Sequence, residues 1–289
     1  MRGFSTSALS QAQGSSYKQM SISYRNTINT GIHGPVTGQD PLEACLPRAN
    51  TFWAGIQPFG HISGIQDWQG TLGYPKWKNT DWLTTSTGSG GAPTADLTPV
   101  ARTSTIVNSC ATIITDDAAD GDGWGIQFSM DGGTTADLPF LPTAGQLLFA
   151  YGRFKTANTS TNSRFYFGLS DANTDIHNAD DDLIMFYKAS GALTMVGRTA
   201  KAGTATDTSA LANSQVNDAY ISLGIRVNGV SSIEFWQGTL PGNMTKSATQ
   251  TTMTNLPDEG MALSFHVETS AAASVTATLQ HMVACQEAL

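Results

Sequence analysis

Residues 219–240, AYISLGIRVNGVSSIEFWQGTL, form two segments of alternating apolar and polar residues joined by a turn. Apolar residues occupy every second position in both segments: Ile221, Leu223, Ile225, Val227, Ile233 and Phe235. Alternation of this kind is typical of β-strands that bury one face. The stretch therefore predicts a β-hairpin with one face in a core and an outward face that carries Glu234 and Trp236.

The same residues restrict the register of the hairpin. A two-residue turn at Asn228 and Gly229 would place Leu223 opposite Glu234, so that apolar and polar side chains share a face. Because a slip of one residue moves every side chain to the other face, burial favours a loop of three or five residues. The expected cross-strand pairs are Val227 with Ser231, Ile225 with Ile233, and Leu223 with Phe235.

Further strand-like segments surround this hairpin from about residue 105 onward, separated by loops rich in Asp, Asn, Gly and Thr. No segment has a convincing amphipathic helical period. Ten strands without interleaved helices predict an all-β fold, an antiparallel β-sandwich or barrel. The expected strands are 105–114, 124–129, 146–156, 164–171, 182–188, 192–199, 219–228, 231–238, 261–269 and 274–286.

The chain before residue 101 has a different character. Residues 1–50 lack a sustained period and are predicted to form an extended N-terminal arm. Residues 1–50 contain four basic residues (Arg2, Lys18, Arg25 and Arg48) and two acidic residues, so their net charge is +2. Residues 51–100 are rich in Gly and Pro and are predicted to form an irregular segment or collar. This segment contains Trp53, Trp68, Trp77 and Trp82. Residues 101–289 are expected to form the β-sandwich domain.

Composition excludes some functions. Only 13% of the residues are charged, and the net charge is −8, which argues against nucleic-acid binding and against binding to anionic membranes. The widely spaced Cys45, Cys110 and Cys285 are expected to be free thiols in a reducing compartment. The first residues lack the apolar run of a signal peptide, so we expect a soluble protein that is synthesised in the cytoplasm.

No catalytic or metal-binding pattern stands out. Glycoside cleavage requires two carboxyl groups across the scissile bond, and no second carboxylate follows Glu234 on its strand face. Asp117, Asp120 and Asp122 resemble a calcium loop in composition but not in spacing. His266 is out of phase with the apolar residues of its strand and should face outward. His281 is in phase with Val275, Leu279 and Val283 and is expected to be a core or edge histidine. We expect neither an enzyme nor a cofactor.

The order of several motifs resembles a known fold family. The motifs are TIVNSCATIITDDAADGDGWGIQF, LLFAYGRFKT with RFYFGLSD, YISLGIRVNGVSSIEFWQGT, and a late strand that ends VTATLQHMVACQ. Together they resemble the concanavalin A-like (laminin-G-like) jelly roll over residues 100–287. They look most like the versions found in virion structural proteins of tailed bacteriophages.

This resemblance implies a capsid decoration (cement) protein on the outside of a virion, synthesised in the host cytoplasm. Its implied partners are the major capsid protein or other virion proteins, and its implied state is a homo-oligomer, often a trimer. The alternative is a carbohydrate- or receptor-binding module of a viral tail or head fibre, which would bind a host glycan. The candidate contact residues are Arg2, Lys18, Arg25, Trp53, Trp68, Trp77, Trp82 and Trp236.

Overall fold

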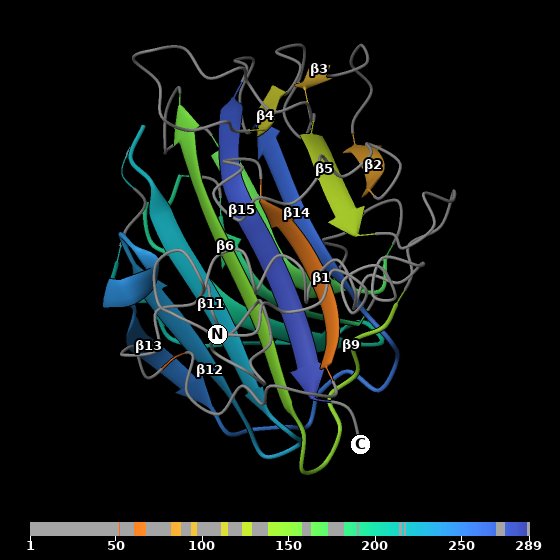
Figure 1. The fold of residues 1–289 in the computed structure, drawn as a ribbon. Helices are drawn as coiled ribbons and strands as arrows, with labels where there is room; N and C mark the ends of the chain where they lie inside the picture. Colours follow the sequence, from red (N-terminus) through yellow and green to blue (C-terminus); the bar gives the residue numbers. More distant parts are fainter. Residues whose placement is uncertain are drawn as a thin grey trace, which may run out of the picture.

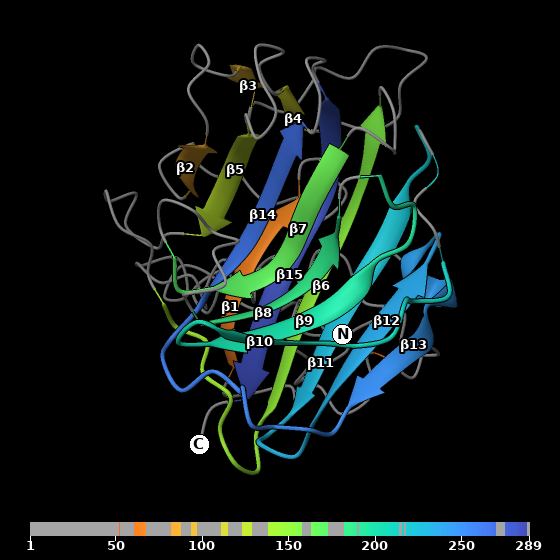
Figure 2. The ribbon, with the colours of Figure 1, turned by 180° about the vertical axis from the view of Figure 1, so that it is seen from behind.

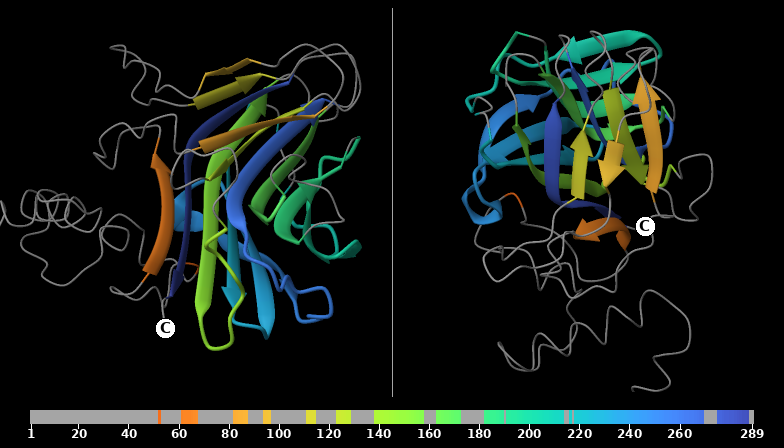
Figure 3. Two further views of the ribbon diagram at one scale, coloured as in Figure 1. Left: turned by 90° about the vertical axis from the view of Figure 1, so that its right-hand side faces the viewer. Right: turned by 90° about the horizontal axis from the view of Figure 1, so that it is seen from above.

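The computed structural model describes Phe52 and residues 61–67, 82–87, 94–96, 111–114, 123–128, 138–157, 163–172, 182–189, 191–213, 216, 218–269 and 275–287. These residues form two antiparallel sheets packed face to face, and they contain no α-helix (Figures 1 and 3). Among them, no helix is long and apolar enough to cross a membrane. The predicted all-β sandwich is therefore confirmed.

Figure 1 shows the molecule from the side of the eight-stranded sheet, as formed by the described residues. Its order is β13 (Thr245–Gln250), β12 (Ser232–Gly238), β11 (Ile221–Asn228), β6 (Leu147–Ala157), β15 (Thr276–Glu287), β4 (Ala111–Ile114) and β3 (Thr94–Asp96). The strand β1 (His61–Asp67) pairs with the second half of β15, next to the part that pairs with β4.

Figure 2 shows the molecule from behind, from the side of the seven-stranded sheet that the described residues form. Its order is β10 (Thr204–Asp207), β9 (Val196–Lys201), β8 (Leu183–Lys188), β7 (Ser163–Ser170), β14 (Ala262–Thr269), β5 (Gly123–Phe128) and β2 (Trp82–Thr87). Each of the ten strands expected from the sequence overlaps a strand of one of the two sheets.

Five strands were not expected. β1, β2 and β3 lie in the segment 51–100 that we predicted to be irregular, and they extend the two sheets. β10 and β13 have the sequences TATD and TKSATQ, which lack apolar alternation. Both are sheet-edge strands, so pairing with one neighbour, rather than burial of a face, positions them.

The main core lies between the sheets and contains the inward faces of the strands. The Phe154 ring of β6 reaches across the sandwich, with centroids 5.1 Å from Phe165 and 4.8 Å from Phe265. Phe235 of β12 reaches across similarly, 5.3 Å from Phe186. All the apolar residues named in the hairpin 219–240 belong to this core, as their alternation predicts.

The register of that hairpin differs from the expected one by two residues. Val227 pairs with Ile233 and Ile225 with Phe235, while Asn228 pairs with Ser232. The phase and the three-residue loop length are as predicted, but the loop is 229–231. Hydrogen bonds around Asn228 explain the shift, since the main-chain N–H and the hydroxyl of Ser231 both donate to the Asn228 carbonyl, at 3.1 and 2.7 Å.

A second apolar cluster covers the outer face of the eight-stranded sheet. Phe52, which is fully buried, lies over β11 and β12, 5.9 Å from the Phe149 ring and 5.8 Å from Trp236. Gly224 makes room for it, because a Cβ atom there would lie 2.6 Å from the Phe52 ring. The outward face of the hairpin is thus a second, smaller core.

A β-bulge in β15 changes which residues face the main core. The register with β6 shifts between Leu279 and His281. Val275 and Leu279 lie in the main core, whereas Val283 lies in the outer cluster. Our expectation that His281 shares one phase with all three residues was therefore wrong, since a bulge reverses the alternation beyond it.

Candidate functional site

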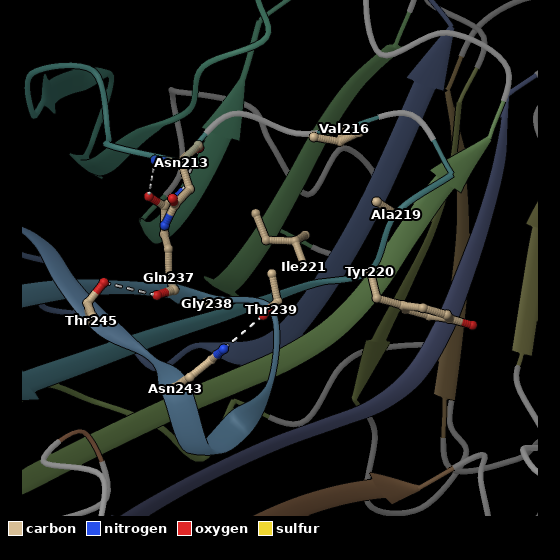
Figure 4. Close-up of a pocket in the computed structure, with 10 residues that line it drawn as sticks. All are labelled: Asn213, Val216, Ala219, Tyr220, Ile221, Gln237, Gly238, Thr239, Asn243 and Thr245. Carbon is tan, nitrogen blue, oxygen red and sulfur yellow. Dashed lines mark hydrogen bonds between the residues drawn. The ribbon is translucent and has the colours of Figure 1, made fainter.

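A cavity of about 390 Å³ opens where β11 begins and β12 ends (Figure 4). Asn213, Val216, Ala219, Tyr220 and Ile221 lie on one side, and the end of β12 with the turn into β13 forms the other. Amide and hydroxyl side chains dominate the polar part of the lining, and no lining residue is charged. The polar residues are Asn213, Gln237, Thr239, Asn243 and Thr245.

Hydrogen bonds hold both sides of this cavity. The buried Gln237 amide accepts from the main-chain N–H of Asn213 at 3.1 Å and donates to the Asn213 carbonyl at 3.2 Å. On the other side, Asn243 donates to the Thr239 hydroxyl at 2.8 Å and accepts from the main-chain N–H of Leu240 at 2.8 Å. These contacts, drawn in part in Figure 4, hold Asn213 against β12 and hold the turn from Thr239 to Asn243.

A second polar region crosses the outer face of the seven-stranded sheet. Arg198 binds Asp207 through two hydrogen bonds of 2.7 and 2.8 Å and lies 4.2 Å from the centre of the Tyr187 ring. Tyr187 is stacked on Tyr166, with ring centroids 5.2 Å apart. Tyr166 in turn lies 6.0 Å from His266. The row thus joins β10, β9, β8, β7 and β14.

A buried carboxylate adjoins this row. Glu268 accepts a 3.3 Å hydrogen bond from Arg164, and the Nε2 atom of His266 lies 3.5 Å from its other oxygen. Burial, with the nearby Glu268 charge, raises the pKa of Tyr166, so this hydroxyl stays protonated. His266 faces outward from the main core, as expected, but it is fully buried on that outer face.

This row is not evident from the sequence, because its members come from five strands. One sign of the row is visible in the sequence: polar residues occupy alternating positions in the segments RFYFG and SFHVE. That Tyr166 meets both Tyr187 and His266 depends on strand order and register, which bring residues of distant segments together.

Lys188 is an ionisable group buried at the end of β8. Its ammonium donates to the main-chain carbonyls of Ser163 and, at 3.4 Å, Ala189. Burial lowers the pKa of Lys188 to about 8. Because the unfolded chain holds this proton to a higher pH, the folded state gains stability as the pH rises from about 8 to about 10.5.

We therefore expect the stability of the protein, relative to a Lys188→Met variant, to increase by about 2 kcal/mol between pH 7 and pH 10. The comparison removes groups common to both proteins, including tyrosines, which titrate in the same range. Urea unfolding at several pH values measures it. A difference that stays constant with pH would contradict the lowered pKa.

Most of the predicted contact residues lie outside the described part of the chain: Arg2, Lys18, Arg25, Trp53, Trp68 and Trp77. Trp82 is the first residue of β2, where only the backbone is described. Trp236 was expected on an exposed outer wall and is instead 7% exposed in the outer cluster. Its cross-strand partner is Gly224, whose missing side chain lets Phe52 cover the indole.

Glu234, like Trp236, makes structural contacts on the outward face of the hairpin. One of its oxygens accepts a 3.1 Å hydrogen bond from the Trp236 indole, and the other lies 3.2 Å from the Lys246 ammonium. Glu234 thus holds the Trp236 indole within β12 and joins β12 to Lys246 of β13.

The described residues also offer no clear site for a metal ion. No group of three His, Cys, Asp or Glu residues that could hold a metal ion occurs among the described residues. Asp117, Asp120 and Asp122 are outside them, as are Cys45 and Cys110. Cys285 is a buried cysteine of the outer cluster.

Comparison with other proteins supports the fold. No family model matches the chain, and no curated protein matches it. Among solved structures, an endo-1,3-β-glucanase from Streptomyces sioyaensis is similar with 14% identity and a TM-score of 0.50, over 82% of this chain and 100% of that one. The carbohydrate recognition domain of Emp47p is similar with 8% identity and a TM-score of 0.51, over 80% and 98%.

The exoplasmic/lumenal domain of VIP36, in its Ca2+/Man-bound form, is similar with 12% identity and a TM-score of 0.50, over 77% of this chain and 88% of that one. At such identities the likeness establishes the fold alone. The sandwich is thus a lectin-like jelly roll, a fold that accommodates both carbohydrate recognition and carbohydrate cleavage.

Proposed function

We propose that the protein is a virion structural protein of the decoration type, which displays its jelly roll on the outside of a capsid and catalyses no reaction. The proposal is supported by the likeness of the motifs in residues 100–287 to jelly rolls of tailed-bacteriophage virions. The major capsid protein is its proposed partner, and a homotrimer is its proposed state.

The observation that carries this arrangement is the burial of Phe52. The residues before it form a basic, Gly- and Pro-punctuated segment, whereas the sandwich is acidic. Phe52 is fully buried between Phe149, Trp236 and Met244 on the outer face of the eight-stranded sheet. This contact fixes the chain to the sandwich directly after residues 1–50. A segment that binds a shell and carries a domain would need such an attachment point.

Deletion of residues 1–50, with Phe52 retained, tests the proposal. We expect the wild-type protein to sediment with shells at a copy number in simple ratio to the shell subunit. The deletion variant should stay in the supernatant with an unchanged melting temperature, because the sandwich and the Phe52 contact are intact. Shell binding by the folded deletion variant would contradict the role of the arm, and absence of the protein from particles would contradict the virion role.

A second candidate is a carbohydrate- or receptor-binding module of a tail or head fibre. The uncharged, amide-lined cavity at the end of β12 favours it. Copy number separates the two candidates, because a fibre contributes few copies to each particle whereas decoration follows the number of shell subunits.

A further inference from the structure

We infer that the cavity between Asn213, Val216 and Ile221 on one side and the turn into β13 on the other is a binding site for one neutral sugar unit. The inference rests on the second proposed function and does not depend on a virion location. A volume of about 390 Å³ lies at the lower end of the range of small-ligand sites, which is roughly 300–1,000 Å³.

The polar lining suits hydroxyl groups. An amide offers a donor and an acceptor side by side, and a hydroxyl offers both at one atom, so each can bind neighbouring hydroxyls of a sugar ring. The Asn213 side chain is exposed and bonds to no other described residue. Asn243 uses one N–H on Thr239 and keeps its second, and the Thr239 hydroxyl that accepts this bond still has a hydrogen to donate.

The apolar lining complements the C–H face of a sugar. Val216, Ala219 and Ile221 lie along one side of the cavity in Figure 4, and Val216 is 63% exposed. The ring of Tyr220 points away from these residues, where the Arg153 guanidinium lies 4.7 Å from its centre. Aliphatic side chains, rather than a stacked aromatic ring, would therefore contact the sugar.

The cavity is organised before a ligand arrives. Besides the Gln237 clamp on Asn213, the main-chain N–H of Leu211 donates to Met195 and that of Asp218 donates to Thr156, each at 2.8 Å. Asn213 and Asp218 are thus each tied to a strand, to β12 and to β6 respectively. A site held in this way loses little conformational entropy when a ligand binds, which favours even small ligands.

The nearby charges indicate a neutral ligand. Arg153 donates to the Thr239 carbonyl and to Gln280, and Lys155 forms a 2.6 Å salt bridge with Asp218. None of these side chains lines the cavity. A carboxylate placed inside would lose hydration without gaining a charged partner.

Titration of the ¹⁵N-labelled full-length protein tests the site. The probes are the methyl glycosides of glucose, galactose and mannose, together with N-acetylglucosamine, in the millimolar range, with sialic acid as the charged control. We expect at least one neutral sugar to shift the side-chain amides of Asn213 and Asn243 and the backbone amides of Gly238 and Thr239. Sialic acid should leave these signals unchanged.

Val216→Trp, which places an indole in the cavity mouth, should weaken binding of that sugar by at least about tenfold, equivalent to about 1.4 kcal/mol. Val230→Trp is the matched control, because Val230 is also exposed but lies in the turn at the opposite end of β11 and β12. Equal binding by Val216→Trp, equal loss in both variants, or no response to any neutral sugar would overturn the inference. Shifts confined to Tyr187 and Arg198 would overturn this site while leaving carbohydrate binding in place.

Discussion

Replacing Gly168 by alanine should prevent the sandwich from reaching its native packing. Gly168 lies in β7, between Met185 of β8 and Ser264 of β14. A Cβ atom there would lie 2.2 Å from the Ile184 carbonyl oxygen and 2.8 Å from the Met185 Cα. Both atoms belong to the backbone of a neighbouring strand, so no side chain can turn aside. Its φ of 157° is, in addition, one that other residues rarely adopt.

We expect this substitution to destabilise the protein by more than about 5 kcal/mol, which is comparable with the whole stability of many domains. Circular dichroism in the near ultraviolet and thermal melting measure the loss. Gly191→Ala is the matched control, since Gly191 also has a positive φ, of 72°, but no atom lies within 4 Å of its added Cβ. That variant should lose only about 1 kcal/mol. Equal melting temperatures for the two variants would contradict the close-approach argument.

Asp182→Ala should produce the second large loss of stability. Asp182 is 5% exposed and accepts three main-chain hydrogen bonds, from Ala202 at 3.3 Å, Asp258 at 2.8 Å and Glu259 at 3.1 Å. It thereby joins the turn between β9 and β10 to the segment that precedes β14. Alanine would leave these N–H groups without their acceptor, at a total cost of about 4 kcal/mol.

Urea unfolding measures this effect, with Asp258→Ala as the control. Asp258 also forms an ion pair, 2.5 Å from Lys201, but its side chain is 65% exposed. Water replaces such a partner readily, so this midpoint should scarcely move. Asp182→Asn, which retains one acceptor oxygen, should fall between the two. A larger effect at Asp258 than at Asp182 would show that the main-chain bonds do not hold these segments.

The hairpin 219–240 shows how far local pattern could predict the fold. Alternation placed Ile225 and Phe235 in the core, and the structure confirms both. It could not choose between registers that differ by two residues, because both keep the same side chains inside. The hydrogen bonds of Ser231 with Asn228 decide that choice.

The outer faces were harder to predict than the core. Trp236 was expected on an exposed wall and is buried, and His266, which was expected to face outward, does so but is buried as well. Alternation reports which side of a sheet a residue occupies, but not whether another segment covers that side. Gly224, a gap in the outer face opposite Trp236, was the one local sign that something packs there.

The sequence by itself determined the all-β class, the positions of ten strands and the inward face of the central hairpin, because these follow from side-chain period and turn chemistry along a continuous segment. The tertiary structure decided the burial of Phe52 over Gly224, the polar row from Asp207 to His266 and the walls of the cavity at Gln237. Each of these joins residues from separate segments, so it exists only once strand order and register bring those segments together.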